Sequence, residues 1–284
     1  MKIIVVPDAA TFLERSAPLR SALPYLTNVM GSVAMSVAHG HGTYETMSWW
    51  IIEDDEQHVR GMMMRTAPHK LVLSPMPRDA LDPAVDAVLQ RDPGIPGVSG
   101  PHDLAHSFLT RFIQVSGRAL RVEVERAILV YVLGSLIVPA PSSGFWRAGE
   151  QDDFELLLTW WNGFADDTDV ERHGFEESVR PSLRDGRMYL WIDADRPVCA
   201  VSHSLAVTTP SGSVARIGPV YTPPEERRRG YASQLTAAVS SRLRQRGHGL
   251  MLFTDAANAT SNGVYTRLGY QKVDELVECA LLPA

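Results

Sequence analysis

The run Arg227-Arg228-Arg229-Gly230 combines residue types that suit the binding of an anion. An apolar strand is expected to end near Thr222, and an amphipathic helix is expected to begin at Arg229 or Gly230. The first turn of a helix has free backbone N–H groups and the positive end of the helix dipole. Gly230 has no Cβ, so a ligand can approach its backbone closely, and the guanidinium groups add charge-assisted donors. The segment therefore predicts a site for a polyanionic ligand.

The chain lacks both of the best-known phosphate-binding motifs, G-x-G-x-x-G after a strand and G-x-x-x-x-G-K followed by Ser or Thr. Arg227, Gly230 and Ala232 instead form the pattern R-x-x-G-x-A. A second pattern follows the next expected strand, and its residues are Asn258, Ser261, Tyr265, Gly269 and Tyr270. In this order, the two patterns resemble the pyrophosphate loop and the following segment of the GNAT superfamily of acyl-CoA-dependent N-acyltransferases.

The resemblance implies acetyl-CoA as the acyl donor and no metal. The pantetheine arm would run along Val220–Thr222 as an extra strand would, and the N–H of Val220 or of a near neighbour would polarise the thioester carbonyl. Tyr265 would act as the general acid that protonates the leaving thiolate, and Asn258 would hold the cofactor through its amide. The cofactor-binding residues implied in this way are Val220, Tyr221, Thr222, Arg227, Arg228, Arg229, Gly230, Tyr231, Ala232, Ser233, Asn258 and Tyr265.

The general base stays open. The expected central strand carries Arg216 and no carboxylate, although GNAT enzymes often have a glutamate on that strand. Asp255, at the end of the following strand, is the tentative base, and His203 and Glu177 come next. Asp255 is also compatible with a turn residue that caps the following helix. Asn258 is likewise compatible with a simple N-cap, and a tyrosine inside a helix with a core residue.

The composition fits a cytoplasmic enzyme. The chain has 284 residues, 45% of them hydrophobic, and a net charge of −6, which argues against nucleic acid or an anionic membrane as its main partner. Its two cysteines, Cys199 and Cys279, suggest a reducing compartment. The longest apolar run, Ala127–Val138, is shorter than the ~20 residues of a membrane span. We expect it to form a buried strand.

Two domains are expected, residues 1–138 and 145–284, because residues 139–144 have the composition of a linker. The expected strands and helices of the second half are Phe145–Ala148, Asp153–Ala165, Val170–Arg184, Met188–Asp193, Pro197–Thr208, Val214–Thr222, Arg229–Arg246, Leu250–Thr254, Asn258–Leu268 and a last strand to about Leu282. This order is the one that GNAT domains use, so residues 145–284 are expected to be the catalytic domain.

The first half repeats this order in outline. Its expected elements are Met47–Glu53, Val59–Thr66, Leu71–Ser74, Ala80–Leu89, Gly97–Ser99, His102–Gln114 and strands that run to Val138. The sequence thus predicts an α+β (mixed α/β) fold of two GNAT units in tandem, each a twisted, mostly antiparallel sheet flanked by helices. The layout is similar to that of mycothiol synthase and the glycine N-acyltransferases.

The two halves differ in the residues that could bind an anion or give a proton. The loop that corresponds to the anion site in the first half contains Pro75 and Pro77, which have no N–H, and it contains no glycine. Phe108 stands where the second half has Tyr265, and it has no proton to give. The first half is therefore expected to be a degenerate, non-catalytic unit. His102 and His106 lie one helical turn apart, but no third ligand is evident, so we expect no metal.

The resemblance also indicates where the acceptor would bind. Trp160, Trp161 and Phe164 are its tentative pocket by resemblance, since the first two helices of a GNAT domain usually shape that pocket. Carboxylates near these helices would suit a cationic acceptor; they are Asp166, Asp167, Asp169, Glu171, Glu176 and Glu177. The expected activity is transfer of an acetyl group to a primary amine of a small molecule or a peptide, by a monomer or a homodimer. The alternative is a non-catalytic acyl-CoA sensor or scaffold.

Overall fold

The structure is a computed structural model that describes residues 1–41, 44–168 and 174–284. The first half contains β1 (Lys2–Val6), α1 (Ala9–Ala22), α2 (Asn28–Ala38), β2 (Met47–Glu53), β3 (Val59–Thr66), β4 (Leu71–Leu73), α3 (Leu81–Arg91), β5 (Gly97–Pro101), α4 (His102–Ser116) and β6 (Leu120–Leu133). The second half contains β7 (Phe145–Ala148), α5 (Phe154–Thr168), α6 (Phe175–Arg184), β8 (Met188–Asp193), β9 (Arg196–His203), β10 (Val207–Thr209), β11 (Gly212–Tyr221), α7 (Tyr231–Gln245), β12 (Gly249–Asp255), α8 (Ala259–Arg267) and β13 (Tyr270–Pro283).

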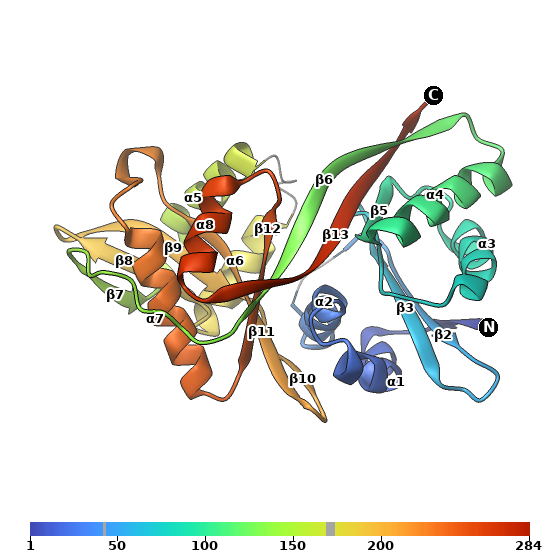
Figure 1. The fold of residues 1–284 in the computed structure, drawn as a ribbon, viewed down its shortest axis with the longest axis horizontal. Coiled ribbons are helices and arrows are strands. Elements are labelled where there is room, and N and C mark those ends of the chain that lie inside the picture. Colours follow the sequence, from blue (N-terminus) through green and yellow to red (C-terminus); the bar gives the residue numbers. More distant parts are fainter. Residues whose placement is uncertain (42–43, 169–173) are drawn as a thin grey trace.

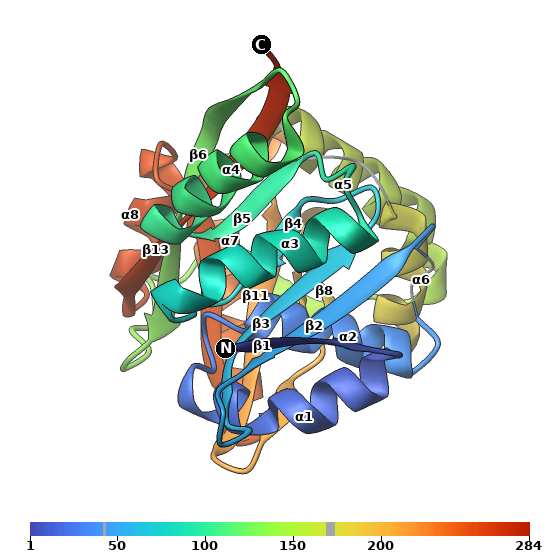
Figure 2. The same cartoon turned by 90° about the vertical axis from the view of Figure 1, so that its right-hand side faces the viewer.

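The two halves follow the same order of elements. Each has a strand, two helices, three strands, a helix, a strand, a helix and a last strand; β10 is an addition to the second half. Helices cover both faces of the sheet that these strands form (Figures 1 and 2). The predicted α+β class and the tandem arrangement are therefore confirmed. Among the described residues, no helix is long and apolar enough to cross a membrane.

The last strands of the two halves are exchanged. The sheet has the order β1-β2-β3-β4-β5-β13-β6-β12-β11-β9-β8-β7, so β13 lies between β5 and β6, and β6 lies beside β12. In register terms, Val277 pairs with Gly100 on one side and with Ala127 on the other, and Tyr131 pairs with Leu252. Figure 1 shows β6 and β13 running together between the two halves. Each half of the sheet therefore depends on a strand from the other half.

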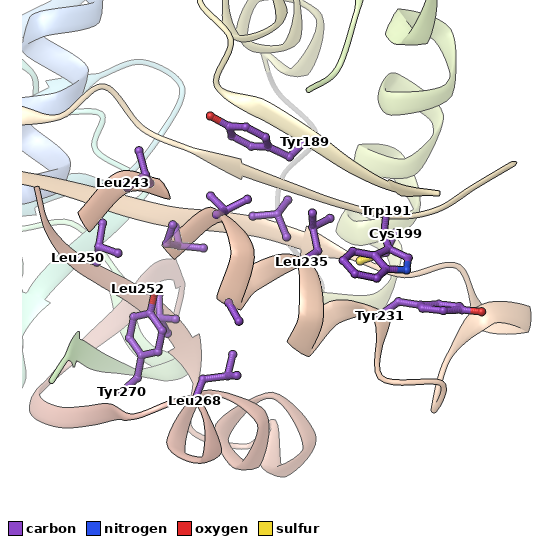
Figure 3. Packing of buried hydrophobic residues seen from close by; sticks show 14 of the residues in the cluster. Tyr189, Trp191, Cys199, Tyr231, Leu235, Leu243, Leu250, Leu252, Leu268 and Tyr270 are labelled. Carbon is purple, nitrogen blue, oxygen red and sulfur yellow. The ribbon is translucent and has the colours of Figure 1, made fainter. Parts of the chain in front are cut away.

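The helix α7 covers one face of the second half's sheet. Leu235, Val239 and Leu243 are buried on this helix against Ala215 and Ile217 of β11, as the helical spacing of the leucines and valine predicts. Figure 3 shows this packing from close by. A separate core on the opposite face holds α5 and α6 against β8 and Ala200 of β9. One face of β11 thus packs against α7 and the other faces α5 and α6. This arrangement positions the site.

Two expectations need correction, and two helices were not predicted. The strand predicted to run to Val138 ends at Leu133, and Val138 itself is exposed. The strand predicted over Pro197–Thr208 is two strands, β9 and β10. The helices α1 and α2 had no sequence signal, because polar residues such as Ser16, Arg20 and Asn28 occupy their buried faces. Of the predicted helix Val170–Arg184, residues 170–173 lie outside the described part of the chain.

Candidate active site

The strands β11 and β12 pair over only part of their length. They run parallel and in register from Val214 opposite Gly249 to Ile217 opposite Leu252. A bulge follows Ile217, and β11 continues as Val220 and Tyr221, which pair with β9 alone. On the side away from β9, the backbone of Val220 and Tyr221 therefore has no strand partner. An extended ligand can pair with this free edge as an added strand does.

A short turn that includes the 3-10 helix Pro224–Glu226 connects the free edge to a candidate anion site at the start of α7. Arg228 has φ 65° and Gly230 has φ 84°, so the loop alternates between left-handed and ordinary backbone conformations, which turns successive N–H groups toward one point. The N–H groups from Arg228 to Ser233 have no acceptor among the described residues. A Cβ placed on Gly230 would contact only Ser142, at 3.9 Å. The start of α7 thus has both of the features that the sequence predicts, free backbone N–H donors and open space around Gly230.

Arg227 stabilises the loop from within. Its Nε donates a hydrogen bond to the Thr222 carbonyl at 2.9 Å, its guanidinium pairs with Asp167 at the end of α5, and it lies over the Tyr221 ring at 5.9 Å. These contacts tie the loop to the strand that precedes it and to α5. The guanidinium of Arg227 is therefore engaged in holding the loop in place.

Arg229 is also engaged, whereas Arg228 is not. Arg229 pairs with Glu226 at 3.0 Å, and Arg196 pairs with the same carboxylate at 2.6 Å. Glu226 is 3% exposed, so this shared carboxylate anchors the loop to the body of the protein. Arg228 is exposed and has no partner among the described residues. Of the three arginines, Arg228 is the one whose guanidinium is free to meet an anion.

The segment 139–144 packs beside the anion site. Gln234 of α7 donates hydrogen bonds to the Pro139 and Ala140 carbonyls, and the Trp191 indole donates one to the Ser143 carbonyl at 2.8 Å. The Ser142 hydroxyl oxygen is buried without a hydrogen-bond partner among the described residues. Sequence reasoning missed this hydroxyl because its composition marks the segment only as a linker. A buried hydroxyl without a partner beside free N–H groups fits an anion-binding site.

Tyr265 lies where the second motif predicts the acid. Its side chain packs against the same core cluster as Val220 of the free edge and Ala232 of α7. Burial raises the pKa of the Tyr265 hydroxyl, and the neighbouring Tyr270 and Cys199 raise it further. The hydroxyl makes no hydrogen bond to another described residue. The group is thus protonated at neutral pH and its proton is not committed elsewhere.

Asn258 and Asp255 both make the capping contacts that were their alternative interpretation. The Asn258 Oδ1 accepts a hydrogen bond from the Ser261 N–H at 3.0 Å at the start of α8. The Asp255 Oδ1 accepts one from the Ala257 N–H at 2.7 Å. Capping uses the Asn258 oxygen and leaves its NH₂ group for a ligand. It also leaves the second Asp255 oxygen for a proton.

The other two candidate bases, His203 and Glu177, have different surroundings. His203 is 8% exposed, stacks on Tyr189 with ring centroids 6.0 Å apart, and has its Nδ1 2.8 Å from the Ser204 carbonyl. Its strand partner Ile217 belongs to the core under α7, so His203 lies on that side of the sheet. Burial lowers the pKa of His203 to about 4. Glu177 is exposed on α6.

The tentative acceptor-pocket residues belong to the core under α5. Trp160 is 9% and Trp161 3% exposed, and Phe164 packs against the same cluster. The Trp160 and Tyr221 ring centroids lie 6.3 Å apart, and a Cβ at position 163 would overlap the Tyr221 hydroxyl. Of the carboxylates suggested for this region, Asp169 and Glu171 lie outside the described residues, while Asp167 pairs with Arg227 and Glu176 with Arg180.

The corresponding region of the first half has different chemistry. Pro75 and Pro77 lie between β4 and α3, and Phe108 is fully buried beside Phe112. The rings of His102 and His106 are 4.8 Å apart, and the described part of the chain contains no group of three or more His, Cys, Asp or Glu side chains placed to hold a metal.

Comparisons with known proteins agree with this architecture. The model of a family described as FR47-like protein matches residues 204–278, which include the anion site and Tyr265. A search of curated proteins finds no match. A GNAT-family acetyltransferase from Colwellia psychrerythraea superposes with a TM-score of 0.61 at 10% identity, over 99% of this chain and 100% of that chain.

Two further solved structures cover nearly the whole chain. A GCN5-related N-acetyltransferase from Sphaerobacter thermophilus has a TM-score of 0.63 at 15% identity, over 99% of this chain and 96% of that chain. A tandem GNAT protein from the clavulanic acid biosynthesis pathway has a TM-score of 0.56 at 13% identity, over 99% of this chain and 98% of that chain. At these identities the likeness concerns the fold. The chain has the tandem GNAT fold, which confirms at that level the resemblance that its two motifs predict.

Proposed function

We propose that this protein is an acyl-CoA-dependent N-acyltransferase that transfers acetyl from acetyl-CoA to a primary amine of a small molecule or a peptide by direct attack. One observation carries the proposal. The β11 edge that has lost its β12 partner at Val220 is followed, after one short turn at Pro224–Glu226, by the free N–H groups at the start of α7, and Tyr265 packs against the same core cluster as Val220 and Ala232. The fold and the acetyltransferase descriptions of similar structures support the same activity.

The residues fit the two chemically distinct parts of an acyl-CoA. The free N–H groups of Arg228–Ser233, the Arg228 guanidinium and the unpartnered Ser142 hydroxyl suit a pyrophosphate. The unpaired backbone of Val220 and Tyr221 suits the amides of a pantetheine arm. Asn258 offers its NH₂ group, since its oxygen caps α8. The donor supplies an acyl group activated as a thioester.

The protein's own groups then act at two atoms. The Val220 N–H would donate a hydrogen bond to the thioester oxygen as negative charge develops there. As the new N–C bond forms and the C–S bond breaks, Tyr265 would give its proton to the leaving sulfur, and the amine would lose a proton to a base. Asp255 is the proposed base, because its second oxygen is free of the Ala257 contact.

The alternative is a protein that binds acyl-CoA as a sensor or scaffold without transfer. The Tyr265 hydroxyl favours the enzyme. Its proton is not engaged by another described residue, and a protein that only binds acyl-CoA has no need of a proton donor at that place.

A thiol-release screen tests the proposal. The intact protein is incubated with acetyl-CoA and pooled primary amines, and free CoA thiol is read with a thiol reagent. The protein's own thiols give little background, since Cys199 and Cys279 are buried and burial raises the pKa of Cys199 to about 12. We expect amine-dependent thiol release and a product heavier by one acetyl group. Tight acetyl-CoA binding without release from any pool would favour the sensor.

A further inference from the structure

Arg216 is a cation on the central strand that the proposed donor site does not use. Its neighbours Ala215 and Ile217 face the core under α7, so its side chain faces the opposite side of the sheet. Ile217 is the last residue of β11 that pairs with β12, which places Arg216 directly before the point where the strands part. On its side of the sheet, Tyr221 packs against α5. Arg216 therefore lies on the same face of the sheet as α5, and the GNAT resemblance places the acceptor pocket beside that helix.

The partners of Arg216 are neutral and come from the first half. Its Nη1 donates hydrogen bonds to the Asn28 Oδ1 at 3.0 Å and to the Ser32 hydroxyl at 3.3 Å, both on α2, and the guanidinium lies over the Phe253 ring at 5.7 Å. Asn28 is 0% exposed and also donates to the Val214 carbonyl, so its oxygen is held in place for Arg216. These contacts orient the guanidinium and leave its charge unbalanced.

The positive charge of Arg216 has no counter-charge in the part of the chain that is described. No carboxylate of these residues lies within 4.0 Å of it, and burial lowers its pKa to about 10, which still leaves it charged at neutral pH. Its Nε and Nη2 have no hydrogen-bond partner among the described residues, and neither nitrogen is sealed from solvent. This half-buried guanidinium therefore keeps an open Nε–Nη2 edge with which it can bind an anion.

Arg20 shows what a structural arginine looks like in the same region. It is 4% exposed, and each of its three nitrogens has an acceptor: Nε has the Ser16 hydroxyl, Nη1 the Thr208 carbonyl and Nη2 the Leu13 carbonyl. Its hydrogen bonds hold α1 against β10. Arg216 differs because the Nε–Nη2 edge, the edge that grips a carboxylate with two parallel hydrogen bonds, is left open.

We propose that Arg216 binds a carboxylate of the acceptor, so that the acceptor is an amine that also carries a carboxylate, such as a free amino acid. This inference rests on the proposed function and specifies its acceptor. A single guanidinium with neutral partners matches a singly charged anion; a phosphate dianion would keep an uncompensated charge. Because Arg216 lies directly before the point where β11 and β12 part, an acceptor held by its carboxylate at Arg216 would have its amine directed toward the thioester.

Matched acceptor pairs test the inference. Amino acids and their carboxamides, such as glycine and glycinamide, are compared as acceptors for the wild-type protein and for Arg216→Gln. We expect the wild type to prefer acids in kcat/KM by at least about tenfold, and Arg216→Gln to lose about 10- to 100-fold on acids while amides change by less than about threefold. The control Arg20→Gln removes a buried arginine nearby and should keep the acid-to-amide ratio.

Binding provides a readout that does not depend on turnover. N-acetylamino acids and their amides are titrated calorimetrically into the CoA-saturated protein, and the acids should bind the wild type more tightly than Arg216→Gln by the same factor. Equal affinity for acids and amides, or no binding of any acid, would overturn the inference. It would also be overturned if Arg216→Gln lost as much kcat/KM with O-phosphoethanolamine as with amino acids. Acetyl-CoA affinity is measured on each variant. If every variant binds acetyl-CoA as tightly as the wild type does, a negative result rules out only the proposed role of Arg216 in acceptor binding. If the wild type does not bind acetyl-CoA, the proposed function itself is wrong.

Discussion

The rings of Tyr265 and Tyr270 meet edge to face with centroids 6.1 Å apart, yet their hydroxyls have different surroundings. The Tyr270 hydroxyl lies 2.8 Å from the Ser240 hydroxyl in a buried hydrogen bond. The Tyr265 hydroxyl has no such partner among the described residues, although its ring is packed against the same core. One tyrosine therefore anchors α7 to the start of β13, and the proton of the other is not engaged by a described residue.

This difference predicts opposite effects of the same substitution. Tyr265→Phe keeps the ring packing and removes the proton, so kcat should fall about 10²- to 10⁴-fold while the acetyl-CoA dissociation constant changes by a few-fold at most. Tyr270→Phe should lower the free energy of unfolding by about 1 kcal/mol, because it breaks a buried hydrogen bond, and should leave kcat nearly unchanged.

Steady-state kinetics, calorimetry and urea unfolding on the same preparations distinguish these outcomes. Loss of cofactor affinity in Tyr265→Phe would make its hydroxyl a binding contact. Full activity in that variant would assign protonation of the sulfur to solvent or to another residue, and this role of Tyr265 would be wrong.

The two interpretations of Asp255 separate in the variant Asp255→Asn. The amide oxygen of asparagine can still accept the Ala257 N–H, so the cap and the stability should survive. If Asp255 is the base, kcat should fall at least about 100-fold at neutral pH and part of the loss should be recovered at high pH, where the amine is less protonated. A rate within about twofold of the wild type across the pH range would leave Asp255 as a cap alone.

His203 predicts a dependence of stability on pH. Its pKa of about 4 in the folded protein lies below the ordinary value of 6.5, because burial disfavours the charged ring. Between these two values the unfolded chain binds a proton that the folded chain excludes, so stability decreases as pH falls from 6.5 toward 4. From pH 7.5 to 5.0 the expected loss from this group is about 2 kcal/mol.

Urea unfolding of the wild type and His203→Gln at both pH values measures this contribution. The variant should be less stable at pH 7.5, where a packed ring has been removed, and should lose less stability on going to pH 5.0. An identical pH dependence in the two proteins would show that other groups cause it.

The sequence predicted the parts of this protein that local patterns determine. Gly230 lies in the left-handed region directly before α7, where the motif requires a residue without Cβ, and the leucine spacing of α7 matches its buried face. The exchange of β6 and β13 could not be predicted, because the backbone of either strand can pair with either neighbour and the choice depends on contacts far apart in the chain.

The other missed features depend on polar burial. The helix α2 buries Asn28 and Ser32, which breaks the apolar period that marks a helix, and these are the residues that orient Arg216. Ser142 lies in a segment of linker composition, and only its packing beside Gly230 identifies it as part of the site. In both cases the functional signal is a three-dimensional contact between residues that are ordinary in sequence.

Gly230 and Gly247 allow the central claim to be tested with one matched pair of variants. Both have φ 84°, and a Cβ at either would meet no atom closer than 3.9 Å, but Gly230 precedes α7 in the anion site and Gly247 follows its other end. Valine at either position should cost similar stability, on the order of 1–2 kcal/mol, through backbone strain. Only at position 230 would the side chain also block a ligand from the free N–H groups.

The measurement is a calorimetric titration of acetyl-CoA into the wild type, Gly230→Val and Gly247→Val. The account predicts stoichiometric binding to the wild type, an affinity within a few-fold for Gly247→Val, and a loss of at least about 100-fold for Gly230→Val. Equal affinity in the two variants would contradict the account, because it would place the cofactor away from the start of α7.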